Sequence, residues 1–152
     1  EHDYDLVSGS SMGALAAANA SALRPELDLR LLLLAPAFGL SDLWREGAGE
    51  KGLAHWKAHG SVPYHHRGFE KDIMLGWDFI KAADRMSWPE LTHPTVIMHG
   101  LQDDIVPIEN SRRVTAENDH VVALLEIEDG HRMQQAGPRF TEAANLLGLV
   151  QE

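Results

Sequence analysis

Residues 4–23 read YDLVSGSSMGALAAANASAL, and this stretch decides the fold class. Its first residues form a short apolar run typical of a β-strand, while the alanine-rich segment Ala14–Leu23 favours a helix. Between them lies GSSMG at residues 9–13, which fits the pattern G-x-S-x-G. We therefore expect a strand over Tyr4–Val7, a sharp turn at Ser11 and a helix directly after it.

The serine at the centre of this turn is a candidate nucleophile. A reactive hydroxyl must project from a turn sharp enough for both a base and a substrate to reach it, and such a turn strains the backbone. Gly9 and Gly13 stand two residues before and after Ser11. We expect that a Cβ atom at either position would collide with nearby backbone, which glycine avoids. A Gly/Ser-rich turn that only caps a helix is the alternative. Ser8 and Ser10 lack glycine two residues away on both sides, so Ser11 is the candidate.

Three further apolar runs follow, at Leu29–Ala35, Thr95–His99 and Val121–Ile127. Helices are predicted over Pro107–Asn118 and from Pro138 onward, the latter because apolar residues recur at helical spacing. Strands that alternate with helices in this way are typical of a parallel sheet with crossover helices. The predicted fold class is therefore α/β.

A long insertion, residues 38–93, interrupts this alternation. It contains all four tryptophans of the chain, which are Trp44, Trp56, Trp77 and Trp88. One helix is predicted inside it, because a stripe of apolar residues recurs at helical spacing: Phe69, Ile73, Trp77 and Ile80. The sequence thus divides into a core, 1–37 with 94–152, and an insertion.

A carboxylate and a histidine follow the last two predicted strands. Asp103 lies in HGLQDDIVP, residues 99–107, where parallel α/β sheets place their functional groups; Asp104 is its nearest competitor, and an Asp-rich turn is the alternative. His131 ends the segment EIEDGH, and Gly130 gives the backbone freedom to turn it inward. Taken alone, such a loop histidine is usually just exposed.

The order Ser, Asp, His, each after its own strand, resembles the α/β-hydrolase superfamily and its small serine esterases and thioesterases. The resemblance runs from Asp5 to the end of the chain and rests on GSSMG, HGLQDDIVP and EDGH. It implies that the four strands are the last four of a hydrolase sheet. It also implies that residues 38–93 form a helical cap, or lid.

The same resemblance implies a mechanism. Ser11 would attack the acyl carbonyl of a carboxylic ester or thioester, His131 would act as general base and then acid, and Asp103 would hold the imidazole. The backbone N–H of Met12 would be one oxyanion donor. This chemistry needs no cofactor, and its partner is a small-molecule acyl substrate. Peptidases, lipases and cofactor-free hydrolases of C–C bonds share the pattern, so the kind of substrate stays open.

The chain departs from the family at its beginning. Members normally have several strands before the nucleophile and a loop that supplies a second oxyanion donor, and few residues precede Ser11 here. We therefore expect a fragment of a longer protein whose nucleophile strand is an open sheet edge, with a possible homodimer through that edge. A catalytically silent module that binds a small apolar ligand or a partner chain is the alternative function.

The aromatic residues suggest where a substrate would bind. Trp44, Trp77 and Phe38 are predicted to line an apolar acyl pocket, although such aromatics could instead form the insertion's own small core. His55 and His59 stand four residues apart, but no third ligand is spaced with them, so no metal site is expected.

Composition excludes several other classes of protein. The 152 residues contain no cysteine, which rules out disulfides, thiolate catalysis and cysteine-based zinc sites. A formal net charge of −10 disfavours nucleic acid and anionic membranes as partners. The longest apolar run is about half the length of a membrane span, so no span is expected. The lack of cysteine fits a reducing cytoplasm and no basic-then-apolar leader is present, so a cytoplasmic location is expected.

Overall fold

The computed structural model describes residues 4–66 and 70–150 and divides into two compact units. Unit 1 comprises Glu1–Phe38 and Trp88–Glu152, and unit 2 comprises Gly39–Ser87. Unit 2 falls inside the stretch 38–93 that the sequence sets apart. That this stretch acts as a cap stays a prediction.

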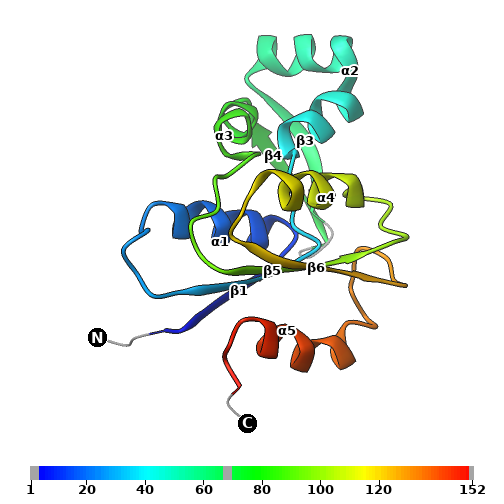
Figure 1. Cartoon of the computed structure of the whole chain (residues 1–152). Helices are drawn as coiled ribbons and strands as arrows, with labels where there is room; N and C mark the ends of the chain where they lie inside the picture. Colours follow the sequence, from blue (N-terminus) through cyan, green and yellow to red (C-terminus); the bar gives the residue numbers. More distant parts are fainter. Residues whose placement is uncertain (1–3, 67–69, 151–152) are drawn as a thin grey trace. The chain divides into compact units, whose positions relative to one another are not determined.

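Unit 1 is built on a four-stranded parallel sheet (Figure 1). The strands lie in the order β1-β2-β5-β6, which is their order along the chain, so the α/β prediction is confirmed. Their bounds are β1, Leu6–Ser10; β2, Arg30–Leu34; β5, Thr95–Gly100; and β6, Val121–Ile127. Strand β1 extends three residues further into the serine motif than predicted.

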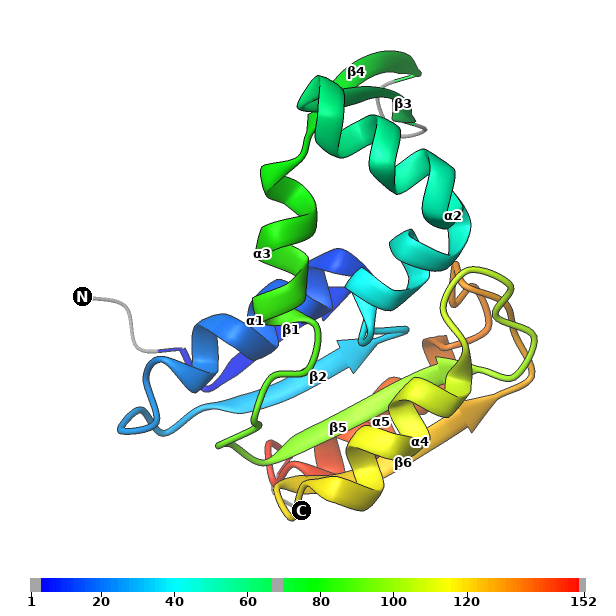
Figure 2. The same cartoon turned by 90° about the horizontal axis from the view of Figure 1, so that it is seen from above.

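Helices cover both faces of this sheet (Figures 1 and 2). Helices α1, Met12–Ala22, and α4, Ile108–Glu117, lie on one face, and α5, Phe140–Leu146, lies on the other. A short 3₁₀ turn, Gly137–Arg139, leads into α5. The apolar residues whose spacing predicts this helix are Phe140, Ala144, Leu147 and Val150. The prediction holds for Leu147, which is buried, but Phe140 is 41% and Val150 52% exposed, and the helix buries Ala143 instead.

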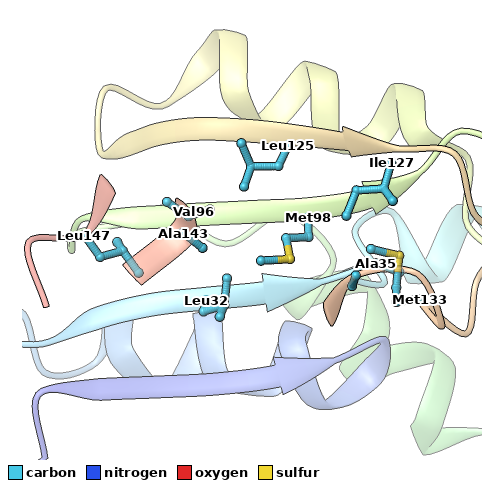
Figure 3. Packing of buried hydrophobic residues seen from close by; sticks show 10 residues of the cluster. Leu32, Ala35, Val96, Met98, Leu125, Ile127, Met133, Ala143 and Leu147 are labelled. Carbon is cyan, nitrogen blue, oxygen red and sulfur yellow. The ribbon is translucent and has the colours of Figure 1, made fainter. Parts of the chain in front are cut away.

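Strand β5 is one of the two inner strands of the sheet, with β2 on one side and β6 on the other. All six residues of β5 are buried, as expected for a strand with a neighbour on each side and a helix on each face. Figure 3 shows the α5 side, where side chains from three strands meet Ala143 and Leu147; they are Leu32, Val96, Met98, Leu125 and Ile127. Burial of each large side chain here contributes about 1.5–3 kcal/mol.

Strand β1 forms one edge of the sheet. Among the described strands it pairs with β2 alone, and its residues alternate between exposed and half-buried. The prediction that the nucleophile strand is an edge strand is therefore confirmed for the described residues. An edge presents unpaired backbone groups to other chains, and the predicted homodimer through this edge stays a prediction.

Unit 2 combines two helices with a two-stranded antiparallel hairpin. Helix α2, Leu40–His59, bends at Gly49, whose φ is 64°. The hairpin pairs β3, Ser61–His66, with β4, Lys71–Gly76, and helix α3 covers Asp78–Met86. The ends of the unit are joined by hydrogen bonds from Gly39 N to Ser87 O (3.0 Å) and from Ser41 N to Ser87 Oγ (2.9 Å).

The predicted helix within the insertion is wrong over residues 71–76, which form strand β4. Ile73 and Trp77 are four residues apart, a spacing that places both side chains on one face of a helix. Side chains also share a face of a strand when their spacing is an even number, so the same pattern fits a strand. Half-buried and exposed residues alternate along β4: Ile73 and Leu75 are half-buried, and Met74 between them is exposed. Helix α3 begins only at Asp78, and Phe69 of the predicted stripe lies outside the described residues.

Candidate active site

The turn at Ser11 is strained. Ser11 joins β1 to α1 with φ 53° and ψ −120°, a left-handed conformation that a residue with a side chain seldom adopts. Its backbone N–H donates to Leu34 O at 2.9 Å, which ties the turn to strand β2. The turn therefore holds the Ser11 hydroxyl at the carboxyl edge of the sheet, as expected for a nucleophile elbow.

The two glycines of the motif are not equivalent. A Cβ atom on Gly9 would lie 2.5 Å from Gly13 O and 2.7 Å from Ala14 N, so only glycine fits where β1 approaches α1. A Cβ atom on Gly13 would meet nothing within 4 Å among the described residues. The expectation that both glycines avoid collisions is thus right for Gly9 and wrong for Gly13.

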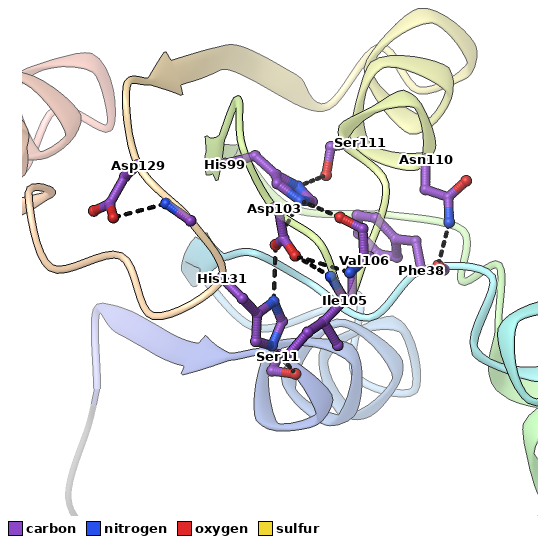
Figure 4. A network of polar contacts seen from close by, with 11 residues as sticks. Ser11, Phe38, His99, Asp103, Ile105, Val106, Asn110, Ser111, Asp129 and His131 are labelled. Atoms are coloured by element: carbon purple, nitrogen blue, oxygen red, sulfur yellow. Dashed lines mark hydrogen bonds and ion pairs between the residues drawn. The ribbon is translucent and has the colours of Figure 1, made fainter.

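Three side chains that are far apart in the sequence lie in one hydrogen-bonded line (Figure 4). Ser11 Oγ is 2.9 Å from His131 Nε2, and His131 Nδ1 is 2.8 Å from Asp103 Oδ2. Because a carboxylate only accepts, Nδ1 carries the proton and donates to Asp103, which leaves Nε2 to accept from the Ser11 hydroxyl. This arrangement equips His131 to take a proton from Ser11.

The loop after β5 fixes the Asp103 carboxylate. Asp103 Oδ1 accepts hydrogen bonds from the backbone N–H groups of Ile105 and Val106, both at 2.9 Å, and the side chain has no exposed surface. Burial raises the pKa of Asp103, but the hydrogen bonds from Val106, His131 and Ile105 outweigh it and hold the pKa below its ordinary value. Asp103 is therefore ionised at neutral pH, whereas its competitor Asp104 is exposed.

The loop after β6 carries His131 and has its own anchor. Asp129 accepts hydrogen bonds from Gly130 N at 2.8 Å and from Gln135 N at 2.5 Å, so its carboxylate spans both sides of His131. The loop also lies against the end of β5, because a Cβ atom on Gly100 would fall 2.8 Å from Gly130 O and closer still to Asp129 O. A side chain at position 100 would therefore force the backbone of Asp129 and Gly130, next to His131, to shift.

His99 has no role in the sequence-based predictions, yet it contacts the same carboxylate. His99 is fully buried, and its Nε2 lies 3.0 Å from Val106 O and 3.1 Å from Asp103 Oδ2. Burial lowers the pKa of His99, and the contacts with Val106 and Asp103 oppose this without cancelling it. The His99 imidazole is thus neutral at neutral pH. The sequence feature that could have indicated this contact is the position of His99 near the end of β5, four residues before Asp103.

A neutral buried His99 predicts how stability changes with pH. The unfolded chain binds a proton on this histidine near its ordinary pKa of 6.5, whereas the folded chain binds it only at lower pH. The free energy of unfolding therefore falls as pH drops below about 6.5, by at most about 1.4 kcal/mol per pH unit from this group, until the folded state also protonates. Above about pH 7 the group contributes no pH dependence.

Urea unfolding at pH 7.5, 6.5 and 5.5 measures this dependence. The variant His99→Gln, which does not titrate in this range, should lose stability less steeply than the wild type over the same interval. Equal slopes for the two proteins would contradict a depressed pKa for His99.

The remaining predicted site residues lie in different places. Met12 is the first residue of α1, where a helix leaves its N–H groups without partners inside the helix, so its N–H is available as an oxyanion donor. Phe38 is fully buried in unit 1, and its carbonyl accepts a hydrogen bond from Asn110 Nδ2 at 2.8 Å. That Met12 is an oxyanion donor and Phe38 a pocket residue stay predictions.

The two predicted pocket residues of unit 2 belong to an aromatic cluster. The Trp44 ring lies 5.8 Å from Trp56, 5.2 Å from Tyr64 and 5.1 Å from Phe79, and Trp77 lies 5.8 Å from Trp56. Trp56 is buried and donates from Nε1 to Leu75 O at 2.9 Å. The cluster forms a small core within unit 2, and contact of Trp44 or Trp77 with a substrate stays a prediction.

Over 4–66 and 70–150, no group of three or more His, Asp or Glu side chains is placed to hold a metal ion. Within the same ranges, every helix is too short or too polar to cross a bilayer.

Comparison with known proteins identifies the fold. No family model matches the sequence, and no curated protein matches it. Among solved structures, mouse alpha/beta hydrolase domain-containing protein 10 is 23% identical, with TM-score 0.73, over 98% of this chain and 62% of its own. Est1E from Butyrivibrio proteoclasticus is 23% identical, with TM-score 0.68, over 96% of this chain and 61% of its own.

A third solved structure, the monoacylglycerol lipase of Paleococcus ferrophilus, is 18% identical, with TM-score 0.63, over 95% of this chain and 68% of its own. The chain has the α/β-hydrolase fold. It spans about three fifths of the length of the first two solved chains.

Proposed function

We propose that the chain is a serine hydrolase that cleaves a carboxylic ester or thioester through an acyl-serine intermediate. The observation that carries the proposal is the hydrogen-bonded line from Ser11 Oγ through His131 to the ionised Asp103, with Ser11 held in a strained turn. The likeness to a chain named as a monoacylglycerol lipase supports an ester as the substrate.

The first half of the reaction forms the acyl-serine. Ser11 Oγ attacks the carbonyl carbon of the substrate while its proton passes to His131 Nε2. The carbonyl oxygen becomes an oxyanion, which the Met12 N–H and the N-terminal end of α1 stabilise. The Asp103 carboxylate stabilises the imidazolium that forms on His131. His131 then gives its proton to the leaving alcohol or thiol as the bond to the carbonyl carbon breaks.

The second half regenerates the enzyme. A water molecule gives a proton to His131 Nε2 and attacks the acyl carbon, and the resulting intermediate collapses to release the carboxylic acid. Ser11 Oγ recovers its proton from His131 in this step. Every proton is thus moved by one histidine, whose ring orientation depends on Asp103.

The variant Asp103→Asn tests this scheme. The two backbone N–H groups that bond Oδ1 would select the oxygen of the new amide for that position, which turns the amide NH₂ toward His131 Nδ1. A donor would then face a donor, so His131 would adopt the wrong tautomer to accept from Ser11. We expect kcat for p-nitrophenyl butyrate and for a butyryl thioester to fall about 10³–10⁴-fold.

Asp104→Asn is the matched control, because Asp104 is exposed and adjacent and its substitution should leave kcat within about twofold. Equal losses in the two variants would contradict the assignment of the acid. A folded wild-type chain that hydrolyses neither substrate would contradict the proposed function and favour a silent module that binds a small apolar ligand.

A further inference from the structure

The mechanism above leaves one buried imidazole at the site unused. His99 lies near the end of β5, has no exposed surface and stands four residues before Asp103. Its two ring nitrogens contact three polar groups: Nδ1 is 2.7 Å from Ser111 Oγ, and Nε2 is 3.0 Å from Val106 O and 3.1 Å from Asp103 Oδ2 (Figure 4).

These contacts determine where the proton lies on His99. A backbone carbonyl and a carboxylate can only accept, so Nε2 must carry a hydrogen. The buried ring is neutral, which leaves Nδ1 to accept from the Ser111 hydroxyl on α4. Ser111 therefore fixes the tautomer that directs the Nε2–H toward Val106 O and Asp103 Oδ2.

The direction of this N–H matters because of the oxygen that it faces. Asp103 Oδ2 is the atom that accepts from His131 Nδ1, while Oδ1 is held by two backbone N–H groups. Without His99, Oδ2 would have one N–H neighbour, His131, and the loop carbonyl of Val106 would lose its donor. The carboxylate and its loop would then be freer to turn away from His131.

We propose that His99 is a positioning residue that acts through Asp103: its Nε2–H holds the carboxylate and the 103–106 loop in the orientation that keeps His131 aligned with Ser11. The predicted effect of His99 on turnover rests on the proposed function. The predicted effect of His99 on the alignment of His131 can be measured without turnover. An apolar side chain of the same volume would fill the space but could not supply the N–H.

Two amide substitutions separate this role from packing. The amide nitrogen of Gln is as many bonds from Cα as the imidazole Nε2, so His99→Gln can keep a donor facing Val106 O and Asp103 Oδ2. The amide of Asn reaches only as far as Nδ1, so His99→Asn can keep the contact with Ser111 and loses the other. Thermal melting first establishes that each variant is folded; if His99→Asn is not, His99→Met takes its place.

The measurements are kcat and KM for p-nitrophenyl butyrate and the proton NMR signal of His131 Nδ1–H in the full chain. In His99→Asn we expect kcat to fall about 10- to 100-fold with KM within about twofold, and the His131 signal to be lost to exchange with solvent. In His99→Gln we expect kcat within about threefold of the wild type and the signal to persist.

The proposal is overturned if His99→Asn keeps both kcat and the NMR signal, or if His99→Gln loses them as His99→Asn does. If the wild type has no turnover, the proposed function fails, and the NMR signal alone decides the role of His99. The two failures are therefore distinguishable.

Discussion

Replacing Ser11 by alanine should lower kcat for p-nitrophenyl butyrate by about 10⁴-fold or more. The substitution removes the one atom that joins the line of hydrogen bonds to the substrate, and His131 Nε2 would then have no hydroxyl to deprotonate. Stability should change by no more than about 1 kcal/mol, because alanine carries the same Cβ into the same strained turn. Initial rates and urea unfolding of the same preparation measure both effects.

Ser10→Ala is the control for this prediction. Ser10 is the neighbouring hydroxyl, is exposed and ends strand β1, so its loss should leave kcat within about threefold. Equal losses in Ser10→Ala and Ser11→Ala would show that the turn as a whole matters, and not the Ser11 hydroxyl.

The two glycines of the serine motif should respond to alanine in opposite directions. In Gly9→Ala the new Cβ would fall 2.5 Å from Gly13 O and 2.6 Å from Gly13 C, and both are backbone atoms at the start of α1. The strand and the helix would have to move apart, so we expect a loss of about 3 kcal/mol or more in the free energy of unfolding. A displaced Ser11 should also lower kcat by about 10²-fold.

In Gly13→Ala the new Cβ would meet no described atom within 4 Å, and Gly13 lies in α1 without a positive φ. Alanine loses less backbone entropy than glycine on helix formation, so we expect a gain of about 0.5–1 kcal/mol. Urea unfolding of the two variants beside the wild type measures the contrast. Shifts of the same sign and size would contradict the close approach of β1 to α1.

The parallel sheet can be predicted from the sequence because its strands are short apolar runs that are clearly distinct from the helical segments between them. A nearly unbroken apolar run such as Leu29–Ala35, interrupted only by Arg30, has few stable places other than a strand covered on both faces. The order of Ser11, Asp103 and His131 then follows from a general property of parallel sheets, since groups after each strand meet at one edge. The sequence cannot predict their distances, which depend on the twist of the sheet and the anchoring of each loop.

The features that escape prediction depend on contacts between distant segments. Strand β4 has a spacing of four residues that fits both a helix and a strand, and only its partner β3 decides between them. His99 can be placed on its strand, but its contact with Ser111 requires the packing of α4 on the sheet. At Gly13 the sequence predicts a contact that the structure lacks: the motif leads us to expect a collision of a Cβ atom at this position, and the fold does not produce one.

The most direct test of the central claim is to treat the folded chain with a fluorophosphonate probe and map the modified residue by peptide mass spectrometry. We expect one adduct per chain, on Ser11, that disappears in Ser11→Ala, forms more slowly in Asp103→Asn and persists in Ser10→Ala. An adduct on Ser10 or on any other residue in place of Ser11, or no adduct on the folded wild-type chain, would contradict the account.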